Sequence, residues 1–283
     1  MNIHQFVPDF SYGDAIGNDA VGIQKILKRW GFESQIFSKV IHPFYRSRAR
    51  YYLYYRYIAQ PDDIILFHYS TGTELIDFIN DFPCRKILVY HNITPADYFE
   101  KINRKVASRC RAGRKKLHTL TNSFELALGD SSYNKEELDT MGFPQTGVLP
   151  IIVDFSSYKR CLKKYPAFPY IKTHFPTLLH VGRAAPNKCL EDILKIVYFC
   201  QKYAPDLRLK LVGSHYDTET YVRALEEMIH RLNLNHVSIT GHVSTLELVQ
   251  TYLASSIYLC VSEHEGFCVP LVEAMYFGIP IIA

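Results

Sequence analysis

Short apolar runs alternate with stretches of helical periodicity along nearly the whole chain of 283 residues. In the first half, the runs that predict strands lie at 2–8, 34–38, 63–69, 86–91, 125–130 and 146–151. In the second half they lie at 177–182, 207–213, 237–241, 256–262 and 280–283. Strands that are apolar throughout are buried on both faces, which is typical of a parallel sheet covered by helices. The chain is therefore predicted to have an α/β fold.

Helical patterns fall between these runs. Residues 16–30 carry apolar side chains at helical spacing, and Gly31 is well placed to end that helix. Ser244 and Glu247 have the spacing of a capping box at a helix start. In the second half, we expect helices to begin near Cys189, Thr218, Ser244 and Pro270.

The length suggests two domains, because a domain typically holds about 150 residues. We predict two doubly wound α/β domains, 1–155 and 156–283. The stretch 152–176 is rich in Lys, Tyr and Pro, lacks periodicity, and is interpreted as the connection. The sequence stops at Ala283 inside an apolar strand that has no helix to cover it. We therefore expect the second domain to be incomplete.

Composition excludes several classes of protein. Hydrophobic residues make up 48% and charged residues 21%, an ordinary globular balance that excludes a disordered or collagen-like chain. No apolar run reaches the ~18–20 residues that span a bilayer, and the first ten residues do not resemble a signal peptide. Seven scattered cysteines without a C-x-x-C pair indicate a reduced, cytoplasmic chain. Twelve dispersed histidines predict no metal site.

Positive charge is concentrated in two segments of the first half. Residues 101–118 hold eight Lys or Arg and no acid, although the whole chain carries a net charge of only +4. Residues 44–57 hold four Arg and six Tyr, again without an acid. Either segment could meet an anionic partner such as a membrane surface. The alternative, a solvated helix face over an aromatic core, stays open.

Ligands of parallel sheets bind at the carboxyl ends of the strands, so the residues that follow each strand are the candidates. Arg183 and Lys188 follow the strand 177–182 and precede a helix, where two cations favour a phosphate or pyrophosphate. Glu265 and Gly266 follow the strand 256–262, and Glu273 lies in the next helix. Together they describe a nucleotide-diphosphate site. Taken singly, Arg183 is also explained as a surface cation and Glu273 as a helix-dipole carboxylate.

The motifs "VGRAAPNK", "LRLKLVG", "TGHVSTLEL" and "SEHEGFCVPLVEAMYFGIPIIA" resemble, in order and spacing, the donor-domain motifs of the family 4 glycosyltransferases. This resemblance implies a GT-B fold, with two Rossmann-like domains facing a cleft. The family's E-x7-E element matches at Glu265 and Glu273, with Gly266 and Phe267 after the first glutamate. The sequence departs from the family at Cys189, where a glycine usually follows the lysine.

The first half resembles the acceptor domain of the same family. "PDFSYGDAIGNDAVGIQKIL" is similar to its first loop, in which Gly13 and Gly17 would let the backbone approach the donor phosphates. "LVYHNITP" places His91 at a strand end, where the family has a histidine near the transferred sugar. His68 also ends a strand, and a purely structural role remains open for both histidines.

The resemblance implies a retaining transferase that moves a sugar from a UDP-, GDP- or ADP-sugar to a glycan or lipid-linked acceptor, as in polysaccharide biosynthesis. The catalytic residues would be Glu265, His91, Arg183 and Lys188. The donor would be bound by Gly13, Gly17, Arg183, Lys188, Gly266, Phe267 and Glu273. Glu273 would hold the ribose, and Arg183 and Lys188 would stabilise the departing diphosphate. No metal or other cofactor is expected.

Two other functions fit parts of the sequence. A non-catalytic nucleotide-sugar-binding protein would follow if the missing C-terminal end prevents catalysis. Nucleic-acid binding through 101–118 is disfavoured, because no recognised binding module surrounds that run. We expect a cytoplasmic protein that is peripheral at the inner face of the membrane, with 44–57 and 101–118 as the segments that meet the lipid.

Overall fold

A computed structural model of the chain describes residues 1–11, 13–165 and 175–283. These residues form two compact units. The first unit contains 1–95 and 108–154, and the second contains 96–107 and 155–283. The predicted domain boundary after residue 155 lies one residue from the point where the chain last passes from the first unit to the second, after Asp154. It assigns 96–107 to the first domain, whereas these residues pack with the second.

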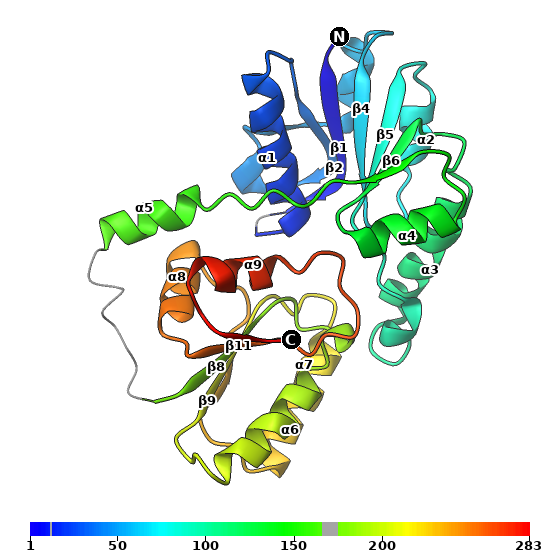
Figure 1. Ribbon diagram of the computed structural model, residues 1–283. Helices are drawn as coiled ribbons and strands as arrows, with labels where there is room; N and C mark the ends of the chain where they lie inside the picture. The colour runs from blue at the N-terminus through cyan, green and yellow to red at the C-terminus, as the bar shows by residue number, and fades with distance from the viewer. Residues whose placement is uncertain (12, 166–174) are drawn as a thin grey trace. The chain divides into compact units, whose positions relative to one another are not determined.

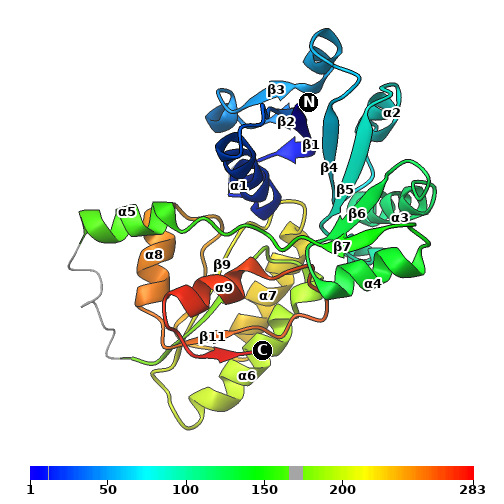
Figure 2. The ribbon, with the colours of Figure 1, turned by 45° about the horizontal axis from the view of Figure 1, so that its top comes forward.

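The first unit is a parallel sheet with helices on both faces, and its strands have the order β3-β2-β1-β4-β5-β6-β7. Its strands are β1 (Ile3–Phe10), β2 (Ile36–Ile41), β3 (Ala49–Tyr51), β4 (Ile64–Tyr69), β5 (Arg85–Tyr90), β6 (Leu126–Gly129) and β7 (Thr146–Val148). Its helices are α1 (Ala15–Arg29), α2 (Leu75–Asn80), α3 (Arg104–His118), whose first turn packs with the second unit, and α4 (Ser132–Thr140), with short 3-10 helices η1 (Pro43–Tyr45) and η2 (Tyr52–Tyr57). Figure 2 shows the strands of this sheet fanned by their twist.

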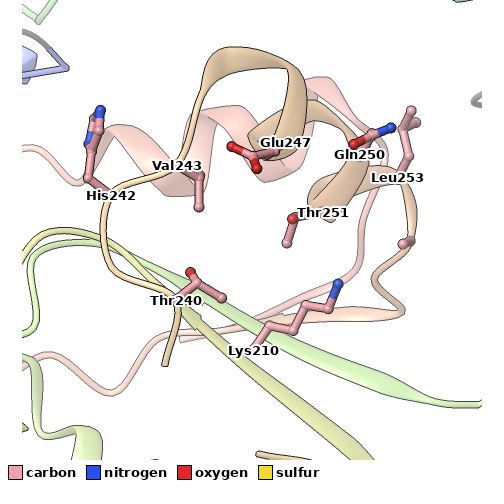
Figure 3. A pocket seen from close by; sticks show the side chains of 9 residues that line it. Lys210, Thr240, His242, Val243, Glu247, Gln250, Thr251 and Leu253 are labelled. Atoms are coloured by element: carbon pink, nitrogen blue, oxygen red, sulfur yellow. The ribbon is translucent and has the colours of Figure 1, made fainter. Parts of the chain in front are cut away.

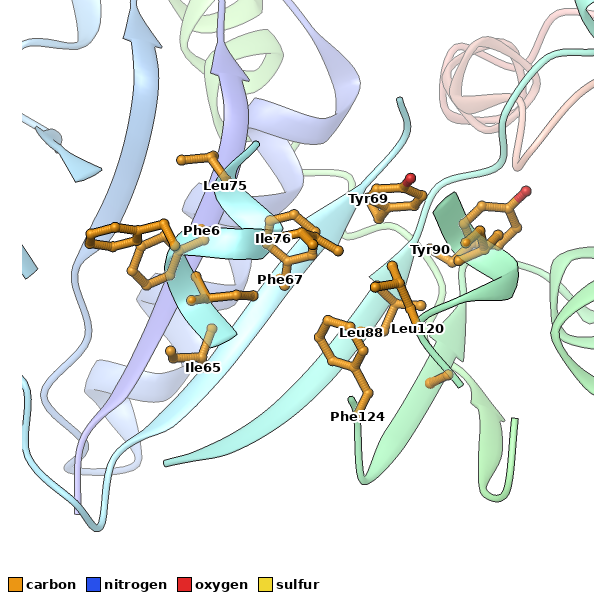
Figure 4. Packing of buried hydrophobic residues seen from close by; sticks show 14 of the residues in the cluster. Phe6, Ile65, Phe67, Tyr69, Leu75, Ile76, Leu88, Tyr90, Leu120 and Phe124 are labelled. Carbon is orange, nitrogen blue, oxygen red and sulfur yellow. The ribbon is translucent and has the colours of Figure 1, made fainter. Parts of the chain in front are cut away.

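The side chains of β4 show why this strand is apolar throughout. Ile65 and Phe67 point into a cluster with α2 and with Leu120 (Figure 4), whereas Ile64 and Leu66 point into a cluster with α1 on the other face. Successive side chains of a strand alternate between faces, so a strand covered on both sides must be apolar at every position.

The second unit repeats the architecture with the strand order β10-β9-β8-β11-β12, and all pairs are parallel. Its strands are β8 (Thr177–Val181), β9 (Arg208–Val212), β10 (Val237–Ile239), β11 (Ile257–Leu259) and β12 (Ile281–Ile282). Its helices are α5 (Ser156–Lys164), α6 (Leu190–Gln201), α7 (Glu219–Arg231), α8 (Thr245–Leu253) and α9 (Val269–Tyr276), with the 3-10 helices η3 (Ala96–Phe99) and η5 (Pro186–Lys188).

Two clusters fill the space on either side of this second sheet. Leu178 and Leu209 pack with α6 and α7, while Leu179 and Tyr258 pack with α8 and α9. The helices accordingly lie in two layers, α6 and α7 on one face and α8 and α9 on the other (Figure 1). The capping box of Ser244 and Glu247 begins α8 as predicted.

The prediction of an α/β fold with two Rossmann-like units is confirmed. Each predicted strand run overlaps an observed strand, and both sheets have the doubly wound order in which strands are added first on one side and then on the other. The order reverses between β1 and β4 in the first unit and between β8 and β11 in the second. Ligands of such sheets bind at the carboxyl ends of the strands at this reversal.

Two segments contain helices or strands that the sequence interpretation did not assign. The stretch 44–57 contributes η1, η2 and the edge strand β3. The expected connection 152–176 contains α5, and its residues 166–174 lie outside the described part of the chain. Within the described residues, no helix has both the length and the apolar character that crossing a bilayer requires.

Candidate functional site

The loops that follow β8 and β11 meet at the strand-order reversal of the second unit, and they carry most of the predicted donor residues. Lys188 ends the first loop, and Glu265 lies in the second. Their side chains form an ion pair, with 2.6 Å between Nζ and Oε2. Lys188 is 16% exposed and Glu265 27% exposed. This pair is thus more shielded than an ordinary surface ion pair, which contributes little.

Two hydrogen bonds hold the two loops together beside this ion pair. The Asn187 side-chain amide donates to the His264 carbonyl (2.9 Å), and the Glu263 N–H donates to the Asn187 backbone carbonyl (3.0 Å). Asn187 and His264 are both buried. The structure therefore brings Lys188, Glu265 and the neighbouring Gly266 and Phe267 into one site on two connected loops.

Arg183 follows β8 and is exposed. Its Nη2 donates to the Tyr216 carbonyl (3.0 Å), and its guanidinium carbon lies 5.9 Å from the centre of the Phe99 ring. The loop is held close to its neighbour by Gly213, which has a φ of 148° and would place a Cβ 1.9 Å from the Gly182 oxygen. Only glycine fits there, because any side chain would overlap the backbone.

Glu273 lies on α9, the helix that follows the Glu265 loop, and it is buried. Its two carboxylate oxygens each accept a phenol hydrogen bond, from Tyr158 (2.5 Å) and from Tyr252 (2.7 Å). Burial, and then the Glu273 charge, raise the pKa of both tyrosines, so both stay protonated and donate. A carboxylate has about four acceptor positions, which leaves two for a ligand.

His180 on β8 is a buried residue near the Lys188–Glu265 ion pair, and no sequence motif marks it. Its Nδ1 lies 3.0 Å from the Leu259 carbonyl, which can only accept, so Nδ1 carries the proton. Burial, with a smaller effect of the nearby Lys188 charge, lowers the pKa of His180 to about 4. The ring is therefore neutral at pH 7, with an unprotonated Nε2 that has no hydrogen-bond partner among the described residues.

Cys189, where the family usually has glycine, forms the junction between η5 and α6. Its φ is 49°, in the left-handed region that glycine enters most readily. The cysteine adopts this conformation while Lys188 keeps its place opposite Glu265.

The first unit contains a buried hydrogen-bonded chain at the ends of β4 and β5. The Gln5 amide nitrogen donates to the Ala20 carbonyl (2.9 Å), so the Gln5 oxygen faces His68 Nε2 (3.0 Å). His68 Nε2 must therefore be the protonated nitrogen. His68 Nδ1 then accepts from His91 Nε2, at 2.8 Å. Burial holds the pKa of His68 well below its usual value, which keeps this ring neutral.

Because His91 Nε2 donates to His68, Nδ1 is the nitrogen of His91 that can bind a ligand. The buried Nδ1 makes no hydrogen bond within the described residues, and Asp130 Oδ2 is 3.6 Å away. Asp14 and Asp19 are further acids whose charges act on His91, and burial raises the pKa of both. His91 thus lies in a buried, acid-lined position.

Gly13 and Gly17 lie at the start of α1, after β1. Gly13 is exposed with a φ of 77°, which a side chain would disfavour. The Gly17 N–H donates to the side chain of the N-cap residue Asp14 (3.1 Å). In this structure the Gly17 N–H is therefore engaged by the protein itself.

A pocket of about 470 Å³ lies elsewhere in the second unit, between β9 and α8 (Figure 3). Lys210 and Thr240 contribute to it from the sheet side, and Glu247 and Thr251 from α8. None of its lining residues is a predicted site residue.

The two basic segments are partly engaged in the fold. Arg114 on α3 donates to the Ile93 carbonyl (2.8 Å) and pairs with Glu137, and Lys116 pairs with Asp77. Other cations of 101–118 are exposed: Lys101, Arg104, Lys105, Arg109, Arg111 and Lys115. In 44–57 the exposed side chains include Phe44, Arg46, Arg48, Arg50, Tyr51, Tyr54 and Tyr57.

Part of the chain is similar to a known protein family. Residues 163–283 match the family described as "Glycosyl transferases group 1". The matched segment spans the β8 and β11 loops and therefore includes Arg183, Lys188, Glu265 and Glu273.

Two curated proteins illustrate the sequence similarity. An uncharacterized glycosyltransferase of Haemophilus influenzae is 34% identical over 107 residues, covering 38% of this chain and 29% of that protein. A GDP-mannose:cellobiosyl-diphosphopolyprenol alpha-mannosyltransferase of Xanthomonas oryzae pv. oryzae is 32% identical over 109 residues, covering 38% of this chain and 28% of that protein. The matches thus span less than a third of either relative.

Solved structures resemble the whole chain in fold. Sucrose-phosphate synthase from Thermosynechococcus elongatus superposes with a TM-score of 0.70 at 16% identity, covering 100% of this chain and 81% of that one. Anabaena HepE in complex with UDP-glucose gives 0.68 at 18% identity, covering 99% and 79%. At such identities the likeness shows the fold alone.

Proposed function

We propose that this protein is a glycosyltransferase that moves a sugar from a nucleoside-diphosphate sugar to a glycan or lipid-linked acceptor. The observation that carries this proposal is the Lys188–Glu265 pair at the strand-order reversal of the second unit. It lies in the segment that matches the group 1 glycosyltransferases. Relatives named for GDP-mannose and a structural neighbour bound to UDP-glucose support a nucleotide-sugar donor.

The reaction breaks the bond between the anomeric carbon and the diphosphate oxygen, and the acceptor hydroxyl forms the new bond. Negative charge grows on the departing diphosphate, and fixed cations stabilise that charge more in the transition state than in the ground state. Arg183 and Lys188 have this role. The backbone of Gly13 contributes to phosphate binding, and that of Gly17 does so once its N–H leaves the Asp14 side chain. The departing diphosphate takes up the proton of the acceptor hydroxyl, and the anomeric configuration is retained.

Lys188 becomes available to phosphate when Glu265 turns to the donor. Glu265 then contacts the hydroxyls of the transferred sugar, together with the backbone of Gly266 and Phe267. The cations supply the electrostatic stabilisation, so transfer does not depend on a metal ion.

Glu273 binds the ribose hydroxyls of the donor. Tyr158 and Tyr252 orient it, because each phenol fixes one carboxylate oxygen. The oriented carboxylate then accepts two hydroxyl groups without rearranging, which lowers the entropic cost of binding.

His91 contacts the transferred sugar through Nδ1. His68 is a positioning residue, because its Nδ1 accepts the Nε2 proton of His91 and thereby selects the His91 tautomer. The hydrogen bond of one ring nitrogen generally decides which histidine tautomer is present.

The test is sugar transfer measured by mass spectrometry, with donors first selected from UDP-, GDP- and ADP-sugars by thermal shift. Arg183→Ala and Lys188→Ala should each slow turnover roughly 10²- to 10³-fold, the loss expected for one transition-state donor. Glu273→Gln should chiefly weaken nucleotide binding. Lys195→Ala, which removes an exposed cation paired with Asp192 on α6, is the matched control. A chelator should leave the wild-type rate unchanged.

Near-normal turnover of the Arg183 and Lys188 variants would refute the assignment of the cations. The alternative function, a non-catalytic nucleotide-sugar-binding protein, predicts donor binding without transfer to any glycan or lipid-linked acceptor. Donor binding by thermal shift and sugar transfer by mass spectrometry therefore distinguish the two functions.

We further propose an anionic membrane surface as a partner, met by the exposed cations of 44–57 and 101–118. Arg50 lies over the Tyr54 ring at 4.5 Å, and both side chains are exposed. An aromatic ring beside a cation suits the boundary between lipid headgroups and acyl chains. The protein would then act in the cytoplasm, peripherally bound at the inner face of the membrane.

A further inference from the structure

Two cysteines lie at the ends of the loop that carries Glu265. Cys260 directly follows β11, and Cys268 directly precedes α9. Their sulfur atoms lie within 4.8 Å of one another and of a Glu265 carboxylate oxygen. The two cysteines are eight residues apart in the sequence, and the fold of the loop 261–267 brings their sulfur atoms close together.

Packing holds the two thiols together. Both cysteines belong to the apolar cluster that joins β11 to α8 and α9, with Tyr258 and Ala274 as fully buried neighbours. Cys260 is 6% exposed, and Cys268 is only partly buried. Of the two residues, Cys268 is therefore the more accessible to a small oxidant.

The backbone at Cys268 is unusual for a residue with a side chain. Its φ is 64°, in the left-handed region. An L-residue is strained in this region, whereas glycine is not. The sulfur is thus held opposite Cys260 at a position that favours glycine, and such outliers mark candidate functional positions.

The two thiols also alter each other's acidity. Their mutual interaction lowers the pKa of Cys260 to about 6, and it raises the pKa of Cys268. The pair therefore holds one proton readily and loses the other near neutral pH. A thiolate is the reactive form of cysteine, so the pair is chemically competent at pH 7.

We propose that Cys260 and Cys268 are a redox-sensitive pair that forms a reversible disulfide across the loop 261–267 when exposed to a hydroperoxide. One thiolate attacks the peroxide oxygen and becomes a sulfenic acid, with loss of hydroxide. The second thiol attacks that sulfur, and the sulfenic oxygen leaves as water. Overall, two thiols and one hydrogen peroxide give one disulfide and two waters.

The disulfide ties the end of β11 to the start of α9 and keeps Glu265 near Lys188. On the proposed function, Lys188 then stays neutralised, and the oxidised protein binds a nucleoside diphosphate more weakly, by roughly tenfold. Disulfide formation itself does not depend on the protein's being a transferase, so the two proposals fail separately.

The experiment oxidises the full chain with hydrogen peroxide, blocks free thiols with N-ethylmaleimide, and maps peptides by mass spectrometry. The expected result is a cross-link between Cys260 and Cys268 that dithiothreitol reverses. Amide exchange of 261–267 should slow roughly tenfold in the oxidised form, because local opening is restricted. Cys268→Ser and Cys260→Ala should each abolish the cross-link, and Cys200→Ser, at an exposed cysteine of α6, should keep it.

Several results would overturn the proposal. One is separate alkylation of both cysteines while the exposed Cys200 is oxidised. Another is protection of the two thiols by Zn²⁺ without any peroxide cross-link, which would make the cluster with Glu265 a metal site. If the reduced protein fails to bind UDP, GDP or ADP but the cross-link forms, the proposed function fails and the redox pair stands.

Discussion

The buried His180 makes the stability of the second unit depend on pH. The pKa of His180 is about 4 in the folded protein and about 6.5 when unfolded. A lowered folded pKa stabilises the fold above pH 6.5, and this stability is lost as the pH falls towards 4. The difference corresponds to about 3 kcal/mol of unfolding free energy.

His180→Asn keeps a donor for the Leu259 carbonyl but does not titrate. We expect its unfolding free energy to fall about 3 kcal/mol less than that of the wild type between pH 7 and pH 4. Urea denaturation at several pH values measures this. His230→Asn, at an exposed position on α7, is the control. Parallel curves for the wild type and His180→Asn would contradict the assignment.

His68 offers a second residue-scale prediction. His68→Gln retains a donor for Gln5 but removes the acceptor of the His91 Nε2 proton, whereas His68→Asn places an acceptor near the lost Nδ1. Ring ¹⁵N NMR should show His91 protonated at Nε2 in the wild type and in His68→Asn, and at Nδ1 in His68→Gln. Turnover should fall about tenfold or more only in His68→Gln. An unchanged His91 tautomer in that variant would exclude the positioning role.

At the scale of elements, helix α8 depends on its first turn. The Ser244 hydroxyl accepts from the Glu247 N–H (3.3 Å), and the Glu247 carboxylate accepts from the Ser244 N–H (2.8 Å). Ser244→Ala should lower the unfolding free energy by about 1 kcal/mol, as loss of an N-cap typically does. Ser244→Thr keeps the hydroxyl and should cost little. Chemical denaturation gives both values, and equal stability of the two variants would argue against the cap.

The sequence predicts elements well where burial imposes a pattern. The strands of both sheets are visible as apolar runs because helices cover both of their faces. Helix α5 is not visible, since its residues are at most partly buried and form no fully buried stripe. The edge strand β3 is missed because it is short and follows no alternation. Residue patterning thus reports burial, and elements with little burial leave little trace.

The same reasoning applies to the site. Lys188 and Glu265 are found because they follow strands at the carboxyl edge and match a family motif. Tyr158 and Tyr252 are missed because they act on Glu273 across a distance of 115 and 21 residues, and nothing local marks them. His180 is hidden within a strand run, and the two cysteines of the redox pair become neighbours only through the fold.

At the scale of the whole molecule, charge is the property to test. The protein should bind vesicles containing phosphatidylglycerol but not phosphatidylcholine alone, and salt should weaken binding. Reversing two exposed charges, Arg46→Glu with Arg50→Glu, should reduce partitioning at least about tenfold. Reversing Arg223 and Arg231 on α7 is the matched control. Equal losses would mean that only net charge matters, and stronger binding to RNA than to vesicles would favour a nucleic-acid partner.

The ion pair between Lys188 and Glu265 also bears on selectivity. A bare phosphate ion would have to compete with the carboxylate that is already paired with the lysine, and it lacks the sugar hydroxyl groups that could bind the displaced carboxylate. An intact sugar nucleotide supplies phosphate oxygens for the ammonium and hydroxyl groups for the displaced glutamate. The internal counter-ion would thus discriminate against abundant free phosphate and admit the complete donor.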